Sequence, residues 1–98
     1  MTITKLLENY NLTLAIKGRL DTMTAPDFET EITSIPESVT ALNLDFSELD
    51  YLSSAGLRVI LIAQKKMNIQ GSMTVSNVNE MNMEVLEVTG FTQILNIL

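Results

Sequence analysis

Two adjacent hydroxyl side chains, Ser53 and Ser54, are the residues of this sequence best suited to chemistry. They lie in the run LDYLSSAGLRVIL, residues 49–61, between an acidic segment and an apolar segment. The apolar segment predicts a helix from about Ser54 to Met67. A serine at the start of a helix can accept a hydrogen bond from a free backbone N–H, which stabilises the helix by ~1 kcal/mol. A cap of this kind explains one of the two hydroxyls, and the sequence leaves open which one.

Catalysis by either serine is disfavoured. A nucleophilic serine needs a general base and an oxyanion hole, and the chain has no His and no Cys. Neither an SxxK motif nor a GxSxG motif is present, and no glycine-rich phosphate-binding loop occurs. We therefore expect no enzyme activity, no catalytic residue and no cofactor.

A phosphate acceptor is the chemistry that this position favours. A phosphoryl group on Ser54, or alternatively on Ser53, would lie at a helix N-terminus, where free N–H groups and the helix dipole favour an anion. It would add about −1.5 to −2 charges to a segment that already carries Asp45, Glu48 and Asp50. A partner docked there would be repelled. The spacing of these three carboxylates does not match a calcium-binding loop, so we expect a solvated acidic rim and no metal site.

Composition limits the class of protein. The chain has 98 residues, of which 46% are hydrophobic, as expected for one small domain with a single core. A net charge of −6 with scattered Lys and Arg argues against nucleic acid as a partner. No apolar run is long enough for a membrane span, and the N-terminus lacks the layout of a signal peptide. We expect a cytoplasmic protein with no membrane partner.

Hydrophobic periodicity predicts the strands. Alternation at Leu12, Leu14 and Ile16 predicts one strand, a weaker strand runs from Ile3 to Glu8, and the Asn-rich turn between them predicts a hairpin. Further strands are predicted over 42–46 and 73–75.

Helix signals follow the strands. Thr24 with Asp27 has capping-box spacing for a helix that ends before Pro36, and Asn77 with Glu80 has the same spacing for a last helix. Met81, Val85 and Val88 are expected to share an apolar stripe on this last helix, with Gly90 as a left-handed cap. Residues 91–98 fit either a strand or an amphipathic turn. The helix after Ser54 has little polar surface, so it is either buried on most sides or offers a second face to a partner.

This order of elements predicts an α/β fold, a small mixed or parallel β-sheet with helices packed mainly on one face. Functional loops in such sheets gather at the carboxyl ends of the strands. The loops at residues 18–21 and 45–53 follow two of the predicted strands. We therefore expect them to lie side by side.

The run DFSELDYLSSAGLRVIL, residues 45–61, resembles the signature segment of STAS domains, in particular the bacterial anti-sigma factor antagonists. Two other segments resemble the same family: GRLDTMTAPDFE at 18–29 and VNEMNMEVLEVTGF at 78–91. The resemblance covers essentially the whole chain and implies a single STAS-like domain over residues 1–98.

The resemblance also implies a function, partner switching. Such proteins bind an anti-sigma factor that is also an ATP-dependent serine kinase, are released when it phosphorylates them, and are restored by a serine phosphatase. The phosphoserine of the family matches Ser54, and Ser53 stands where an aspartate often precedes it. The expected partner-binding residues are Arg19, Asp21, Asp45, Glu48, Asp50, Ser53, Leu57 and Arg58. The alternative is an unphosphorylated, constitutive STAS scaffold in another signalling or transport assembly.

Overall fold

The computed structural model describes every residue from 1 to 98 and contains one five-stranded sheet. The strands are β1 (Thr2–Glu8), β2 (Asn11–Leu20), β3 (Ala41–Asp45), β4 (Leu49–Leu52) and β5 (Ser72–Ser76). The helices are α1 (Ala25–Thr33), α2 (Ser54–Gln70) and α3 (Glu80–Val88), followed by a short 3₁₀ helix η1 (Phe91–Gln93). No helix combines the length and the apolar character that crossing a membrane requires.

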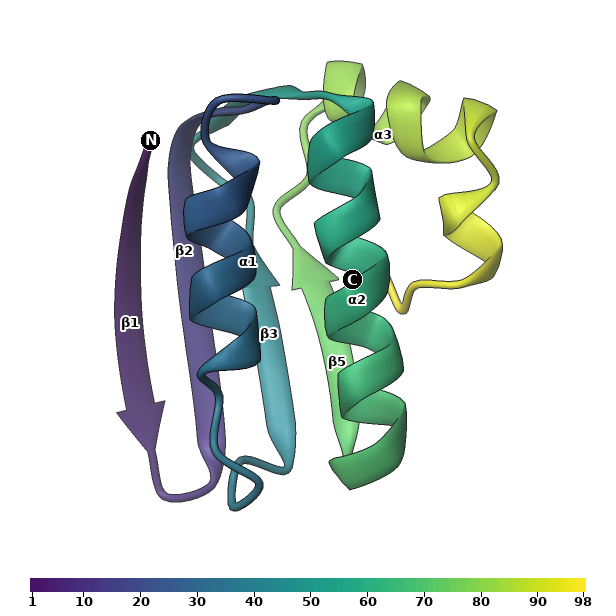
Figure 1. Cartoon of the computed structure of the whole chain (residues 1–98). Coiled ribbons are helices and arrows are strands. Elements are labelled where there is room, and N and C mark those ends of the chain that lie inside the picture. Colours follow the sequence, from purple (N-terminus) through teal and green to yellow (C-terminus); the bar gives the residue numbers. More distant parts are fainter.

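The sheet is mixed, as the sequence predicts. β1 and β2 form the expected antiparallel hairpin, β2, β3 and β5 run parallel, and β4 pairs in parallel with the end of β2. Helices α1 and α2 lie side by side over one face of this sheet, and α3 lies on the far side of α2 from α1 (Figure 1). The predicted α/β fold class is therefore confirmed.

The core lies between the sheet and these helices. In β2, Leu12, Leu14 and Ile16 are buried, whereas Thr13 and Ala15 on the opposite face are only half-buried. This is the alternation that the sequence shows, because successive side chains of a strand point to opposite faces. Helices α1 and α2 bury apolar residues in this core, among them Phe28, Ile32 and Ile60.

One strand is absent from the sequence prediction. β4 lies within the segment 45–53, which the sequence predicts to be a loop, and its burial alternates irregularly: Leu49 and Leu52 are buried, and Asp50 and Tyr51 are exposed. Without period-two alternation, such a segment carries no strand signal. β2 also continues beyond Gly18, which has a φ of +95°, and the register of its pairing with β4 shifts between Gly18 and Arg19.

Both predicted capping boxes are wrong. Thr24 makes no side-chain cap to α1; instead the Asp21 carboxylate accepts hydrogen bonds from the N–H groups of Met23 (3.0 Å) and Thr24 (3.2 Å). The N-cap of α3 is Asn79 rather than Asn77, and its side chain accepts from the Asn82 N–H at 2.8 Å. Asp and Asn side chains bond nearby backbone groups in several registers, so residue spacing does not select one.

The apolar stripe of α3 lies mostly at the surface of the molecule. Met81 and Val88 are 63% and 80% exposed, and the buried residues of the helix are Asn82 and Leu86. Gly90 takes the left-handed conformation expected of it, with a φ of +79°. For residues 91–98 the sequence left a strand and an amphipathic turn open. The structure contains both kinds of element, because the helical turn η1 is followed by a single parallel bridge between Ile97 and Val75 on β5.

Candidate functional site

The site begins where β2 and β4 end side by side and the chain enters α2. The Ser53 N–H donates to the Leu20 carbonyl at 2.9 Å, which ties the start of the helix to the end of β2. Ser53 keeps an extended backbone (φ −99°, ψ 173°), and its side chain accepts from the Gly56 N–H at 3.4 Å. Ser53 is therefore the N-cap of α2.

Ser54 is left with a different environment. It is the first helical residue of α2, and its side chain is exposed, whereas Ser53 is half-buried. Backbone N–H groups in a first helical turn have no partner within the helix, and the dipole makes this end favourable for negative charge. The exposed hydroxyl thus lies beside donors suited to an anion.

Gly56 allows α2 to start this close to the sheet. A Cβ atom at this position would lie 2.7 Å from Leu20 Cγ and 3.0 Å from Leu52 Cδ1. Both leucines are buried at the ends of the strands that support the site. A side chain at this approach would force one of these buried leucines to shift, so the position of the two serines depends on Gly56.

A cation and an aromatic ring pack beside this helix start. Arg19 and Tyr51 are paired across β2 and β4, and the Arg19 Cζ lies 4.1 Å from the centre of the Tyr51 ring. Arg19 also forms an ion pair with Asp21, with Nε to Oδ2 at 3.4 Å. Sequence analysis identified Arg19 and Asp21 but missed Tyr51, because its pairing with Arg19 depends on the unpredicted strand β4.

The hydrogen bonds at Asp21 set its charge state. Desolvation tends to raise its pKa, but donation from Thr24, Met23 and Arg19 outweighs this effect and holds the pKa below the usual Asp value. Asp21 is therefore an anchored carboxylate that fixes the turn between β2 and α1.

The acidic rim consists of Asp45, Glu48 and Asp50, and hydrogen bonds hold part of it in place. Asp45 is half-buried and accepts from the Asn77 side chain (2.9 Å) and the Ser47 N–H (3.0 Å). The bond from Asn77 is the main reason that the pKa of Asp45 lies below its usual value, against the opposing effect of desolvation. Glu48 and Asp50 are exposed, and Glu48 pairs with Lys17 at 3.5 Å. The carboxylates form no cluster suited to a metal ion.

The two expected contacts on α2 differ in exposure. Leu57 is only 6% exposed and belongs to the core, so its side chain has little surface to offer a partner. Arg58 is exposed and its Nη1 donates to Glu29 Oε1 on α1 at 2.9 Å. The apolar sequence of α2 left open whether the helix is buried on most sides or offers a second face to a partner. Burial accounts for most of its apolar residues, because seven residues of the helix are buried: Gly56, Leu57, Val59, Ile60, Ala63, Gln64 and Met67.

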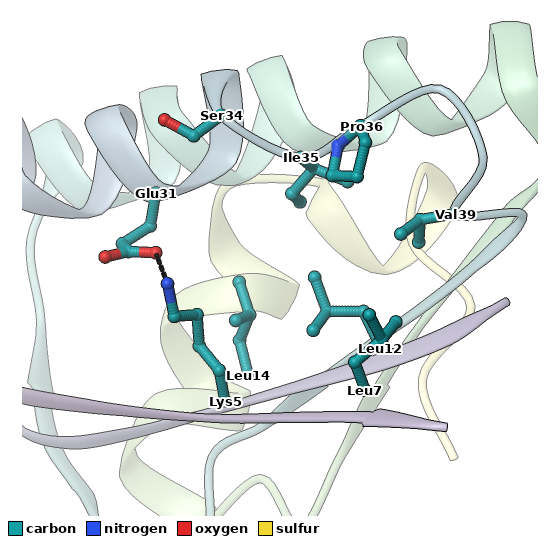
Figure 2. Close-up of a pocket in the computed structure, with 9 residues that line it drawn as sticks. All are labelled: Lys5, Leu7, Leu12, Leu14, Glu31, Ser34, Ile35, Pro36 and Val39. Carbon is teal, nitrogen blue, oxygen red and sulfur yellow. Dashed lines mark ion pairs between the residues drawn. The ribbon is translucent and has the colours of Figure 1, made fainter. Parts of the chain in front are cut away.

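A separate pocket lies elsewhere on the molecule. It has a volume of about 260 Å³ and lies between the β1–β2 hairpin and the end of α1. Figure 2 shows apolar side chains along its walls and the Lys5–Glu31 ion pair, 3.2 Å long, at one side. None of the predicted site residues lines this pocket.

Comparison with known proteins identifies the family. The family model for the STAS domain matches residues 3–98. BtrV of Bordetella bronchiseptica, named as a candidate anti-sigma factor antagonist, is 32% identical over 85 residues, covering 85% of this chain and 73% of that protein. The chain therefore belongs to the STAS domain family, among its anti-sigma factor antagonists.

Solved structures show the same fold. An anti-sigma factor antagonist from Mycobacterium paratuberculosis superposes with a TM-score of 0.86 at 21% identity, over 98% of this chain and 83% of that one. The Bacillus cell fate determinant SpoIIAA in its phosphorylated form superposes with a TM-score of 0.76 at 15% identity, over 99% of this chain and 91% of that one. The mixed sheet and its helices are thus those of anti-sigma factor antagonists.

Proposed function

We propose that this protein is an anti-sigma factor antagonist controlled by phosphorylation of Ser54. Unphosphorylated, it binds an anti-sigma factor that is also an ATP-dependent serine kinase, and so frees a sigma factor for transcription. The kinase transfers the γ-phosphoryl group of ATP to the Ser54 hydroxyl, and the modified protein leaves its partner. A serine phosphatase restores the binding form.

The observation that carries this proposal is the different position of the two serines at the start of α2. Ser53 provides the cap of α2, and Ser54, one residue later, is exposed at the first helical position. A phosphoryl group on Ser54 would keep the cap intact and lie near unpaired helix N–H groups. Modification therefore leaves the fold in place and changes only the surface.

The charge of the surroundings supports release by repulsion. Phosphorylation adds about −1.5 to −2 charges a few residues after the exposed carboxylates of Glu48 and Asp50. The proposed partner surface combines these two residues with Ser53, Arg19, Asp21 and Arg58. Asp45 contributes by fixing the loop, and Leu57 supports the surface from the core.

The names of similar proteins agree with this proposal. BtrV is named as a candidate anti-sigma factor antagonist, and SpoIIAA has been solved in both phosphorylated and unphosphorylated forms. Those descriptions apply to those proteins, and they motivate the same assay for this chain.

Phosphorylation is tested by incubating the protein with its anti-sigma factor kinase and ATP, followed by intact-mass analysis and peptide sequencing by mass spectrometry. Wild type should gain one phosphoryl group on Ser54, Ser54→Ala should gain none, and the matched Ser53→Ala variant should still gain one. A phosphoryl group that disappears in Ser53→Ala and persists in Ser54→Ala would assign the acceptor to Ser53 instead.

Partner binding is tested by calorimetry with the same kinase. Ser54→Ala should bind as wild type does, and Ser54→Asp, which adds a negative charge at the helix start, should bind more weakly. If all three proteins bind one partner equally and none is phosphorylated, the chain is a constitutive STAS scaffold and the proposed switch is wrong.

A further inference from the structure

The outer face of α3 is an apolar stripe that nothing in the chain covers. Met81, Val85 and Val88 follow one another at spacings of four and three residues, which places them on one side of the helix. Met81 is 63% and Val88 80% exposed, and Val85 is half-buried between them. Burial of such residues is favourable, so this stripe is suited to contact with another molecule.

A polar anchor explains why the stripe faces outward. Asn82 is 1% exposed and its Nδ2 donates to the Leu49 carbonyl on β4 at 2.9 Å, while Asn79 donates to the same oxygen at 3.2 Å. Leu86, one turn further on, is fully buried. These contacts fix the rotation of α3, and the helix cannot turn its stripe inward without leaving Asn82 and the Leu49 carbonyl unpaired in the interior.

The charges on α3 itself are all of one sign. Glu80, Glu84 and Glu87 lie on the same helix, and the chain contains no Lys or Arg after Lys66. A shallow groove of the surface carries both features, since it is lined by Met81, Glu84, Val85, Val88 and Thr89. This C-terminal surface is therefore apolar along its centre and acidic at its border.

We propose that the outer face of α3 binds a basic amphipathic helix of another protein. Met81 and Val88 are seven residues apart along α3, or about 10 Å at 1.5 Å per residue, which matches apolar anchors at helical spacing on a partner. Lys or Arg residues beside those anchors would meet the glutamates of α3. A helix is favoured over an added strand because the tail already bridges Val75 on β5 through Ile97.

The acidic border also argues against two other occupants. A second copy would bring its own Glu80, Glu84 and Glu87 against the same three residues, and like charges at an interface are unfavourable. An anionic membrane surface would be repelled for the same reason. The inference does not depend on Ser54, which lies on α2 rather than α3.

The test uses the ¹⁵N-labelled chain and a synthetic peptide of about 18 residues made of Leu and Lys, with Leu repeated at helical spacing. The control peptide has Glu in place of Lys. On titration with the Lys peptide, amide signals of residues 81–88 should shift, and binding should weaken as NaCl is raised. The Glu peptide should not bind.

Two variants locate the contact. Met81→Ser combined with Val88→Ser should weaken binding about ten-fold or more, because both apolar anchors are lost. Ile69→Ser is the matched control, since Ile69 on α2 is 89% exposed and lies outside the stripe; it should bind as wild type does. All three side chains are largely exposed, so the NMR spectra should show an unchanged fold. Ser54→Ala should bind the peptide equally, which separates this test from the phosphorylation assay.

Four results would overturn the inference. They are an absence of binding, equal binding of the Lys and Glu peptides, shifts centred on residues 45–50 instead of α3, and unchanged affinity in the double variant. A dimer seen by analytical ultracentrifugation that disappears in the double variant would replace the proposed partner with a second copy of the chain.

Discussion

The close approach of α2 to the sheet at Gly56 gives a quantitative prediction for Gly56→Ala. The added methyl group would lie 2.7 Å from Leu20 Cγ, and Leu20 is fully buried, so the leucine has no open space into which to move. Overpacking of a filled core costs about 1–3 kcal/mol, whereas Ala in place of Gly in a helix gains up to about 1 kcal/mol. We expect a net loss of about 1–2 kcal/mol in the free energy of unfolding.

Urea denaturation followed by circular dichroism measures this loss, and thermal denaturation should show a melting temperature lower by roughly 5–10 °C. Ser54→Ala is the matched control, because it places an Ala in the same helical turn at an exposed position; its stability should change by less than about 0.5 kcal/mol.

A double-mutant cycle tests the cause. In a Leu20→Ala background the methyl group introduced by Gly56→Ala gains room, so the cost of this substitution should shrink or reverse. If Gly56→Ala is as stable as wild type, or costs the same with and without the Leu20 side chain, the close contact at 2.7 Å does not limit this position.

Three further predictions test other parts of the structure. The pKa of Asp45 is lowered in the folded state, so this carboxylate stabilises the fold above the ordinary Asp value of about 4, and the stabilisation is lost as the pH falls through the lowered pKa. Asp45→Asn should therefore reduce the loss of stability at acid pH. An unchanged pH profile in urea denaturation would contradict this prediction. Asn82→Ala removes a buried donor to the Leu49 carbonyl and should cost about 1–3 kcal/mol in the same assay; a neutral effect would show that the anchor of α3 is dispensable. Leu57→Ala should cost about 2–4 kcal/mol while Arg58→Ala stays near neutral, and the reverse order would place Leu57 at the surface.

The parts of the fold that were predictable are those whose side chains repeat with the period of the element. Leu12, Leu14 and Ile16 alternate along β2, and Phe28 and Ile32 repeat along α1, and all five are buried as expected. Burial of apolar surface is the main favourable term in folding, so a pattern that matches the element reports which face is inside. β4 escaped prediction because only its first and last residues are buried, which is compatible with a loop.

α3 shows why the period alone is insufficient. Its sequence offers two faces that contain apolar residues, and the spacing favours the stripe that is exposed in the structure. The choice was made by Asn82, since a buried amide needs a partner and the Leu49 carbonyl supplies one from another part of the chain. Such a long-range bond has no signature in local sequence.

For the candidate site, too, some features follow from the sequence and others only from the tertiary structure. The sequence by itself determined that two hydroxyls stand at the start of a helix, a few residues after several carboxylates, in a chain without His or Cys. Only the tertiary structure decided that Ser53 caps the helix and Ser54 is exposed, because the bond from the Ser53 N–H to the Leu20 carbonyl fixes the extended backbone that a cap requires. It also decided that Tyr51 meets Arg19 while Leu57 lies inside, since both outcomes depend on how β4 and α2 pack against the end of β2.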